Sequence, residues 1–179
     1  MPRLRRLVAA VSVLALTGCA TMNVSSHVDR TVDFAAYRTY DWGPADALPT
    51  GDPRLDNNRF FHDYFQGAVE KGMAMRRFVK TADAPDLLIH YHANVTRQID
   101  VVAIEREYRN CTGRDCYPGV IDYEAGTLMI DIVDARTNRL VWRAWAQEGV
   151  GGVIDNQDRL RERVNRAVEK MLEELPGVL

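Results

Sequence analysis

The stretch Asp86-Leu87-Leu88-Ile89-His90-Tyr91-His92-Ala93-Asn94-Val95-Thr96-Arg97-Gln98 (residues 86–98) decides the fold, because it predicts one long β-strand. Side chains of a strand alternate between its two faces. One face would carry only apolar and aromatic side chains: Leu87, Ile89, Tyr91, Ala93 and Val95. The other would carry a mixed set: Leu88, His90, His92, Asn94 and Thr96. This asymmetry indicates a sheet with one buried face and one face partly in contact with water.

Two segments flanking this strand have the apolar periodicity of amphipathic helices. They run from about residue 57 to 76 and from about 156 to 175, where Pro176 ends the second. The first has an apolar stripe of Phe61, Tyr64, Phe65, Ala68, Val69, Gly72 and Met73. The second has a stripe of Leu160, Val164, Ala167, Val168, Met171, Leu172 and Leu175. Both stripes predict packing against a sheet.

Other segments predict further strands, at residues 24–28, 38–42, 127–133 and 140–147. Residues 134–139 predict a hairpin loop in which Asn138 suits a left-handed backbone conformation. Residues 99–119 show no regular pattern.

The last predicted strand carries two tryptophans on opposite faces. Trp142 would join Leu140 and Ala144 in the core. Trp145 would share the outer face with Val141 and Arg143.

The order strand, helix, strands, helix predicts an α+β fold: a two-layer sandwich with a mixed, mostly antiparallel sheet and two helices packed on one face. The first helix can serve as the crossover between parallel strands. The total of 179 residues suits a single domain, which we place at residues 27–179.

The N-terminus predicts a processing segment rather than part of the domain. A basic start with Arg3, Arg5 and Arg6 precedes the short apolar run 7–16, which is too short to span a bilayer. Leu16-Thr17-Gly18-Cys19 resembles the lipobox of bacterial lipoproteins. The resemblance implies a signal peptide over residues 1–18, lipidation of Cys19 and a tether over residues 19–26. An ordinary secretory signal is the alternative.

The residue after Cys19 indicates which of the two membranes, inner or outer, would hold the lipid anchor. It is Ala20 rather than the Asp that tends to retain lipoproteins in the inner membrane. The resemblance therefore implies the outer membrane, with the domain facing the periplasm.

The two remaining cysteines, Cys111 and Cys116, lie in a stretch rich in turn residues. In an oxidising compartment such a pair predicts a disulfide that shapes a local loop. A redox dithiol is less well supported, because the spacing is not Cys-x-x-Cys. Zinc is the weakest alternative, since two cysteines lack an obvious second pair of ligands.

Composition excludes several classes of function. A net charge of -2 does not favour a nucleic-acid partner. The only serines are Ser12, Ser25 and Ser26, which lie in the signal and tether and leave no serine-hydrolase motif. No phosphate-binding or dinucleotide-binding glycine motif is present, so the sequence predicts no cofactor.

Two sets of residues carry a possible chemistry. His90 and His92 would share one strand face, and either a nearby carboxylate, such as that of Asp131, or the imidazole of His62 would have to complete a metal site. This is the basis of an alternative function, a metal-dependent envelope hydrolase. The acids Asp122, Glu124, Asp131 and Asp134 could be paired for hydrolysis, although turn and strand positions explain them more simply.

Several motifs together resemble one lipoprotein family. They are Asp33-Phe34-x-x-Tyr37-x-Thr39-Tyr40-x-Trp42, Pro85-Asp86-Leu87-Leu88-Ile89-x-Tyr91-His92, Tyr123-x-x-Gly126-Thr127-Leu128-x-Ile130-Asp131-x-Val133-Asp134 and Leu140-Val141-Trp142-Arg143-Ala144-x-Ala146. With the C-terminal helix they resemble the family called domain of unknown function 4136, over nearly all of residues 23–176. The resemblance implies a bacterial envelope lipoprotein with no established enzyme chemistry. The loop of Cys111 and Cys116 departs from the pattern.

We therefore expect a non-enzymatic binding or structural module of the cell envelope. Its expected working surface is the outer sheet face with His90, His92, Arg143 and Trp145, beside the cysteine loop. The expected partners are the membrane, through the lipid anchor, and another envelope protein or a cell-wall component.

Overall fold

A computed structural model describes residues 22–44, 50–56, 58–110 and 121–177. Within them the elements follow the order β1 (Asn23–Val28), a 3-10 helix (Phe34–Ala36), β2 (Thr39–Trp42), α1 (Arg59–Met75), β3 (Val79–Lys80), β4 (Leu87–Ile99), α2 (Val101–Asn110), β5 (Asp122–Asp134), β6 (Arg139–Gly149) and α3 (Gln157–Glu173).

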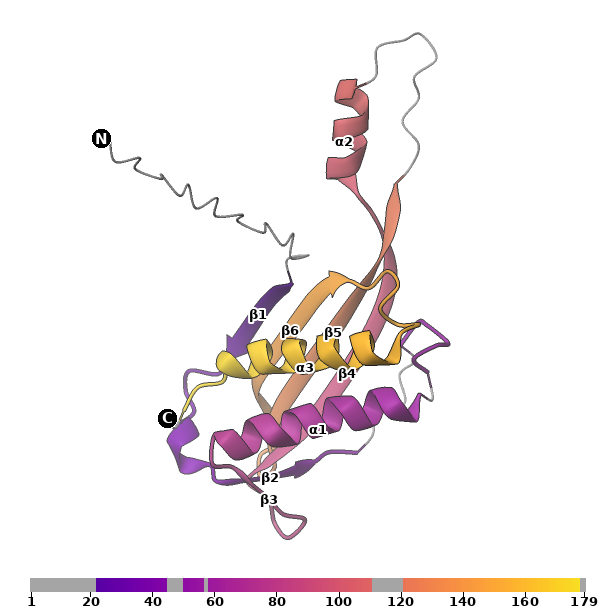
Figure 1. The fold of residues 1–179 in the computed structure, drawn as a ribbon. Coiled ribbons are helices and arrows are strands. Elements are labelled where there is room, and N and C mark those ends of the chain that lie inside the picture. The colour runs from indigo at the N-terminus through magenta and orange to yellow at the C-terminus, as the bar shows by residue number, and fades with distance from the viewer. Residues whose placement is uncertain (1–21, 45–49, 57, 111–120, 178–179) are drawn as a thin grey trace, which may run out of the picture.

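The strands form one mixed sheet with the order β1-β6-β5-β4-β2-β3. β2 is parallel to β3 and β4, and the other neighbours are antiparallel. α1 lies between β2 and β3 in the chain, so it is the predicted crossover between parallel strands. The α+β class with a mixed sheet is thus confirmed. Figure 1 shows α1 and α3 side by side across the sheet.

The two long helices bury the apolar stripes that the sequence predicts. α1 buries Phe61, Phe65, Val69, Gly72 and Met73. α3 buries Leu160, Val164, Ala167, Val168, Met171 and Leu172. The sheet contributes fully buried side chains, among them Leu87, Ile89, Ile130, Ile132 and Trp142. Helices and sheet therefore share one hydrophobic core.

Local interactions fix where the helices begin and how closely they approach. The side chain of Asn58 accepts the N–H of Phe61 at 3.1 Å, and that of Asn156 accepts the N–H of Arg159 at 3.0 Å. These N-caps satisfy donors that the first turn leaves free. A Cβ at Gly72 would lie 2.3 Å from Cδ1 of Leu172, so the absence of a side chain there allows α1 and α3 to pack closely.

The side chain of Asp86, just before β4, forms hydrogen bonds to residues 38 and 39 at the start of β2. Its Oδ2 accepts the N–H groups of Arg38 at 2.8 Å and Thr39 at 2.9 Å, and the Thr39 hydroxyl at 2.9 Å. The backbone N–H groups of Arg38 and Thr39 hold the pKa of Asp86 below its ordinary value, because they stabilise the carboxylate. The parallel pairing of β2 with β4 begins one residue beyond this cluster.

Helix α2 corrects the expectation that residues 99–119 are irregular. Residues 101–110 are helical, and Oδ1 of Asp100 accepts the N–H of Ala103 at 2.8 Å near its start. No described side chain of α2 is buried. Val101 and Ile104 have helical spacing, but the helix is only ten residues long, which is shorter than the window over which apolar periodicity identifies a helix reliably.

The predicted faces of β6 need one correction as well. Trp142 and Ala144 are buried as predicted, but Val141 is buried and Leu140 is exposed. The cause is a register irregularity, in which Ile132 pairs with Trp142 while Val133 pairs with Leu140. Val141 is the extra residue of a β-bulge, which inverts the alternation on its N-terminal side. Asn138 has a φ of 54°, as predicted for the hairpin loop.

The sheet begins earlier than the proposed tether boundary. Asn23 to Val28 pair residue by residue with β6, so residues 23–26 belong to the folded sheet. Val24 and Val28 pack against the core, which supplies the reason for this pairing. No helix among the described residues has the length and apolar character to cross a membrane.

Phe65→Ala is expected to lower the free energy of unfolding by about 3–5 kcal/mol, because it leaves a cavity in the core. Phe60→Ala is the matched control on the same helix, where the ring is exposed, and should change stability by less than about 0.5 kcal/mol. Urea unfolding of both variants provides the measurement. Equal losses would contradict the assignment of the buried face.

Asp86→Asn is expected to destabilise the protein at about pH 7 and to have a smaller effect in acid. The folded-state pKa of Asp86 is depressed, so its contribution is present above the unfolded pKa and disappears as the pH falls through the folded pKa. Urea unfolding from about pH 7 to about pH 3 should show the two stabilities converging. Asp83→Asn, at an exposed position nearby, is the control. A gap that stays constant with pH would contradict the prediction.

Candidate interaction surface

The outer sheet face, opposite α1 and α3, brings distant residues into register. His90 of β4 pairs with Asp131 of β5, Asp131 with Arg143 of β6, and Arg143 with His27 of β1. Directly opposite residues on adjacent strands point to the same face. A row of four polar side chains therefore crosses the sheet.

An ion pair forms the centre of this row. Arg143 donates from Nε to Oδ1 of Asp131 at 2.6 Å and from Nη2 to Oδ2 at 2.5 Å, while Asp131 is only 6% exposed. Two parallel hydrogen bonds of this kind fix the guanidinium and the carboxylate in one relative orientation. The hydrogen bonds that Arg143 donates to the Asp131 carboxylate raise the pKa of Arg143. The carboxylate on this strand is thus held by a guanidinium rather than left free for proton transfer.

Trp145 lies in the next row, between Met129 of β5 and Ser25 of β1. Its ring is half-buried and contacts the ring of His27, with a centroid separation of 5.2 Å. His27 is exposed and is a residue that sequence reasoning missed. Alternation along residues 23–28 could place His27 on one face, but only the pairing with β6 shows that this is the face of Trp145.

His92 and His90 take different places. Nε2 of His92 lies 3.8 Å from Oδ2 of Asp131, so this imidazole belongs to the Arg143 cluster. The His90 ring lies against Gly43, the residue that follows the end of β2, because a Cβ at Gly43 would lie 2.1 Å from Cε1 of His90. Of the four predicted surface residues, Arg143 and His92 meet at Asp131, Trp145 is one row away, and His90 lies over the end of β2.

The histidine arrangement does not build the proposed metal site. No three His, Cys, Asp or Glu side chains are grouped to hold a metal ion among the residues that the structure describes. Asp131 is engaged by Arg143. The third proposed ligand, His62, hydrogen-bonds instead through Nδ1 to the hydroxyl of Tyr91 at 2.5 Å. The metal-dependent hydrolase therefore gains no geometric support.

The other acids have separate structural partners. Asp134 accepts the N–H groups of Arg136 at 3.0 Å and Thr137 at 2.7 Å in the hairpin loop, and the Tyr37 hydroxyl at 2.8 Å. The carboxylate of Glu124 accepts from Nη2 of Arg54 at 3.0 Å. These contacts explain the acids as supports of turns and loops.

A cleft opens where β2 ends beside β4. It has a volume of about 360 Å³ and is lined by Trp42, Gly43, Pro44, Thr50, Phe61, His62, Gln66, Ile89, His90, Tyr91, His92 and Ala93. Pro44 and Thr50 bracket residues 45–49, which lie outside the described residues.

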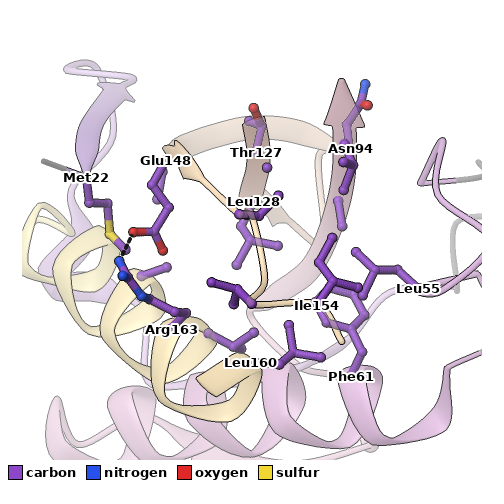
Figure 2. Close-up of a pocket in the computed structure, with 18 residues that line it drawn as sticks. Met22, Leu55, Phe61, Asn94, Thr127, Leu128, Glu148, Ile154, Leu160 and Arg163 are labelled. Carbon is purple, nitrogen blue, oxygen red and sulfur yellow. Dashed lines mark hydrogen bonds and ion pairs between the residues drawn. The ribbon is translucent and has the colours of Figure 1, made fainter. Parts of the chain in front are cut away.

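A second space lies between the sheet and the N-terminal part of α3 (Figure 2). Its walls are mainly apolar, with Leu55, Phe61, Leu128 and Ile154 among them. Glu148 and Arg163 form an ion pair at one side, next to Met22. The cavity measures about 50 Å³, well below the roughly 300–1,000 Å³ typical of small-molecule sites. We interpret it as space between packed layers.

The chain belongs to the family described as Domain of unknown function (DUF4136), whose model matches residues 24–177. This match confirms the family resemblance read from the motifs. The matched region contains every described element except the first residue of β1. No curated protein matches the chain significantly.

Several solved structures are similar to this chain at low sequence identity. A PDZ domain protein from Parabacteroides distasonis has a TM-score of 0.54 and 16% identity over 88% of this chain. This chain spans only 37% of that protein's length. A PelC dodecamer from Paraburkholderia phytofirmans has a TM-score of 0.44 and 13% identity, over 85% of this chain and 95% of that one.

A minor lipoprotein from Acinetobacter baumannii is a third neighbour, with a TM-score of 0.39 and 9% identity over 78% of this chain and 92% of that one. The likeness to the first structure supports the fold and carries no information on activity. Cys19, Cys111 and Cys116 lie outside the described residues, so lipidation and the disulfide stay predictions.

Arg143→Ala is expected to lower the free energy of unfolding by about 1–3 kcal/mol, because it leaves the buried Asp131 carboxylate without its main donor. The matched control is Arg139→Ala, which breaks the more exposed pair with Asp29 and should cost about 0–1 kcal/mol. Thermal and urea unfolding provide the comparison. A loss no larger for Arg143→Ala than for the control would refute the role given to this pair.

Proposed function

We propose that this protein is a lipid-anchored envelope protein that acts by binding a partner, without catalysis, on the outer face of its sheet. The observation that carries the proposal is the chemistry of that face. Figure 1 shows α1 and α3 on the opposite side of the sheet, and no other described helix covers the outer face. An uncovered sheet face in a folded domain is available for contact with another molecule.

The residues of this face suit protein recognition. Trp145 is half-buried against His27, so its ring is held in place before any partner arrives. Arg143 is oriented by Asp131 and remains 38% exposed along its side chain. Aromatic and arginine side chains that are fixed in advance are typical of residues that dominate binding energy. We therefore favour another envelope protein as the partner, with a cell-wall component as the alternative.

The N-terminal sequence supports a location at the cell envelope. The lipobox-like Leu16-Thr17-Gly18-Cys19 supports lipidation of Cys19, and Ala20 supports the outer membrane with the domain in the periplasm. A cysteine that carries two or three acyl chains holds a protein on a membrane far more firmly than a single chain does.

Cys19→Ser is expected to abolish incorporation of labelled fatty acid and to remove the protein from the membrane fraction. Both effects follow because the acyl chains attach through the thiol at this position. Cys116→Ser, at a cysteine assigned to a disulfide, should retain both the label and the membrane fraction. Undiminished labelling of Cys19→Ser would refute the anchor.

The binding face can be tested by photo-crosslinking in intact cells. A photoreactive residue introduced at Ser25, beside Trp145 on the outer face, should capture a specific partner. The same residue introduced at Glu169, exposed on α3, is the control for the opposite side. Trp145→Ala should reduce capture at Ser25 by about tenfold, as for the loss of a hot-spot residue. Equal capture at both positions, or capture insensitive to Trp145→Ala, would refute this surface.

A further inference from the structure

The two longest strands extend beyond the rest of the sheet. β6 ends its pairing at Gly149, opposite Ala125, while β4 and β5 continue to pair with each other from Thr96 and Ala125 to Ile99 and Asp122. Helix α2 follows directly from this two-stranded ribbon. Figure 1 shows the ribbon and α2 projecting past the end of the sheet. We call residues 96–110 and 121–124 the arm.

The arm concentrates exposed apolar surface. Ile99 is 59% exposed, Val101 and Val102 are each 61% exposed, and Tyr123 is 41% exposed. These are four of the eight large hydrophobic side chains recorded as exposed in the described residues. Ile99, Val101 and Val102 gather where the ribbon meets α2, whereas Tyr123 pairs with Gln98 and so lies on the ribbon face opposite to that of Ile99. Three exposed apolar side chains so close together on a projection favour a contact site. A ten-residue helix and a two-stranded ribbon are also marginal in water unless they pack against something.

The arm carries a small excess of acidic side chains. Its three arginines, Arg97, Arg106 and Arg109, face five acids, Asp100, Glu105, Glu107, Asp122 and Glu124. Arg97 and Asp122 lie within ion-pair distance of each other, at 3.9 Å. The arm therefore has no electrostatic attraction to anionic lipid headgroups or to an acidic protein. Its attraction to a partner must come mainly from the apolar side chains.

The position of the first residue of β1 indicates which surface covers the arm. β1 starts at Asn23, which pairs with Gln147 near the end of β6, so the chain enters the sheet at the end from which the arm projects (Figure 1). Asn23 follows Cys19 by four residues, which span at most about 14 Å. A lipid on Cys19 would hold this end of the molecule close to the bilayer.

We infer that the arm docks on the lipid surface as a second membrane contact beside the lipid anchor. Val101, Val102 and Ile99 insert among the acyl chains near the headgroups, in the manner of an interfacial helix. The inference rests on the proposed anchoring at Cys19. Two contacts at one end fix the orientation of the domain, whereas one flexible tether does not. The outer sheet face, which runs along the side of the molecule, is then kept accessible in the periplasm.

The test uses the full-length lipidated protein, isolated from membranes and reconstituted in phosphatidylcholine vesicles. A photoreactive residue, p-benzoylphenylalanine, is introduced at Val102 and separately at Val79. Val79 of β3 is equally exposed, at 61%, and lies at the opposite end of the sheet. Irradiation should crosslink Val102 to lipid about tenfold more than Val79, as expected for a side chain inserted in the bilayer. Equal lipid capture at the two positions would overturn the inference.

A second pair of variants tests the apolar contact itself. With the photoreactive residue at Ile99, the double change Val101→Asp and Val102→Asp should reduce lipid capture by about tenfold, because carboxylates oppose burial in the bilayer. Val79→Asp should leave capture unchanged. Capture of a second copy of the chain in place of lipid would overturn the inference and identify the arm as an interface between copies. Since labelling of Cys19 with fatty acid is measured independently, loss of arm capture with intact labelling would reject the arm contact alone.

Discussion

Burial of one face of the sheet by α1 and α3 is the interaction on which the rest of this structure depends. Leu87, Ile89, Ile130, Ile132 and Trp142 leave water only because the two helices lie over them. Strand register is thereby fixed, since a shift of one residue would turn these side chains to the opposite face. The bulge at Val141 is a local adjustment within the same constraint, because it places a further apolar side chain in the core.

The parts of the sheet that α1 and α3 leave uncovered are the parts available for binding. Along β4 the burial fades from Leu87 and Ile89, which are fully buried, to the exposed Ile99. Beyond the helices the strands form the arm, and on the opposite face they carry polar and aromatic side chains. The pairing of Asp131 with Arg143 makes a buried carboxylate tolerable on that face, since each charge is hydrogen-bonded to the other. It also orients the guanidinium beside Trp145.

These features give the proposed functional parts distinct places in the molecule. The arm and the start of β1 share one end, whereas the row from His27 to His90 crosses the outer face. An anchor at one end and a binding face along the side would allow membrane attachment without blocking the partner. Membership in the DUF4136 family assigns no activity to the domain, and its described residues contain no group of three or more His, Cys, Asp or Glu side chains that could hold a metal ion. The wider fold also occurs as part of a larger PDZ domain protein.

The amino-acid sequence by itself determined the elements that face the core. Period-two and helical apolar patterns predicted β4, β5, β6, α1 and α3, because burial imposes those repeats on a sequence. The family followed from motifs in the same elements. Tertiary structure alone decided the order of the strands, the bulge at Val141 and the meeting of His27 with Trp145. These depend on the register between paired strands, which no pattern within one strand encodes, and in the case of His27 and Trp145 the two strands lie more than 100 residues apart. Helix α2 also required the structure, because its ten residues are fewer than the window over which a helical apolar pattern is recognised.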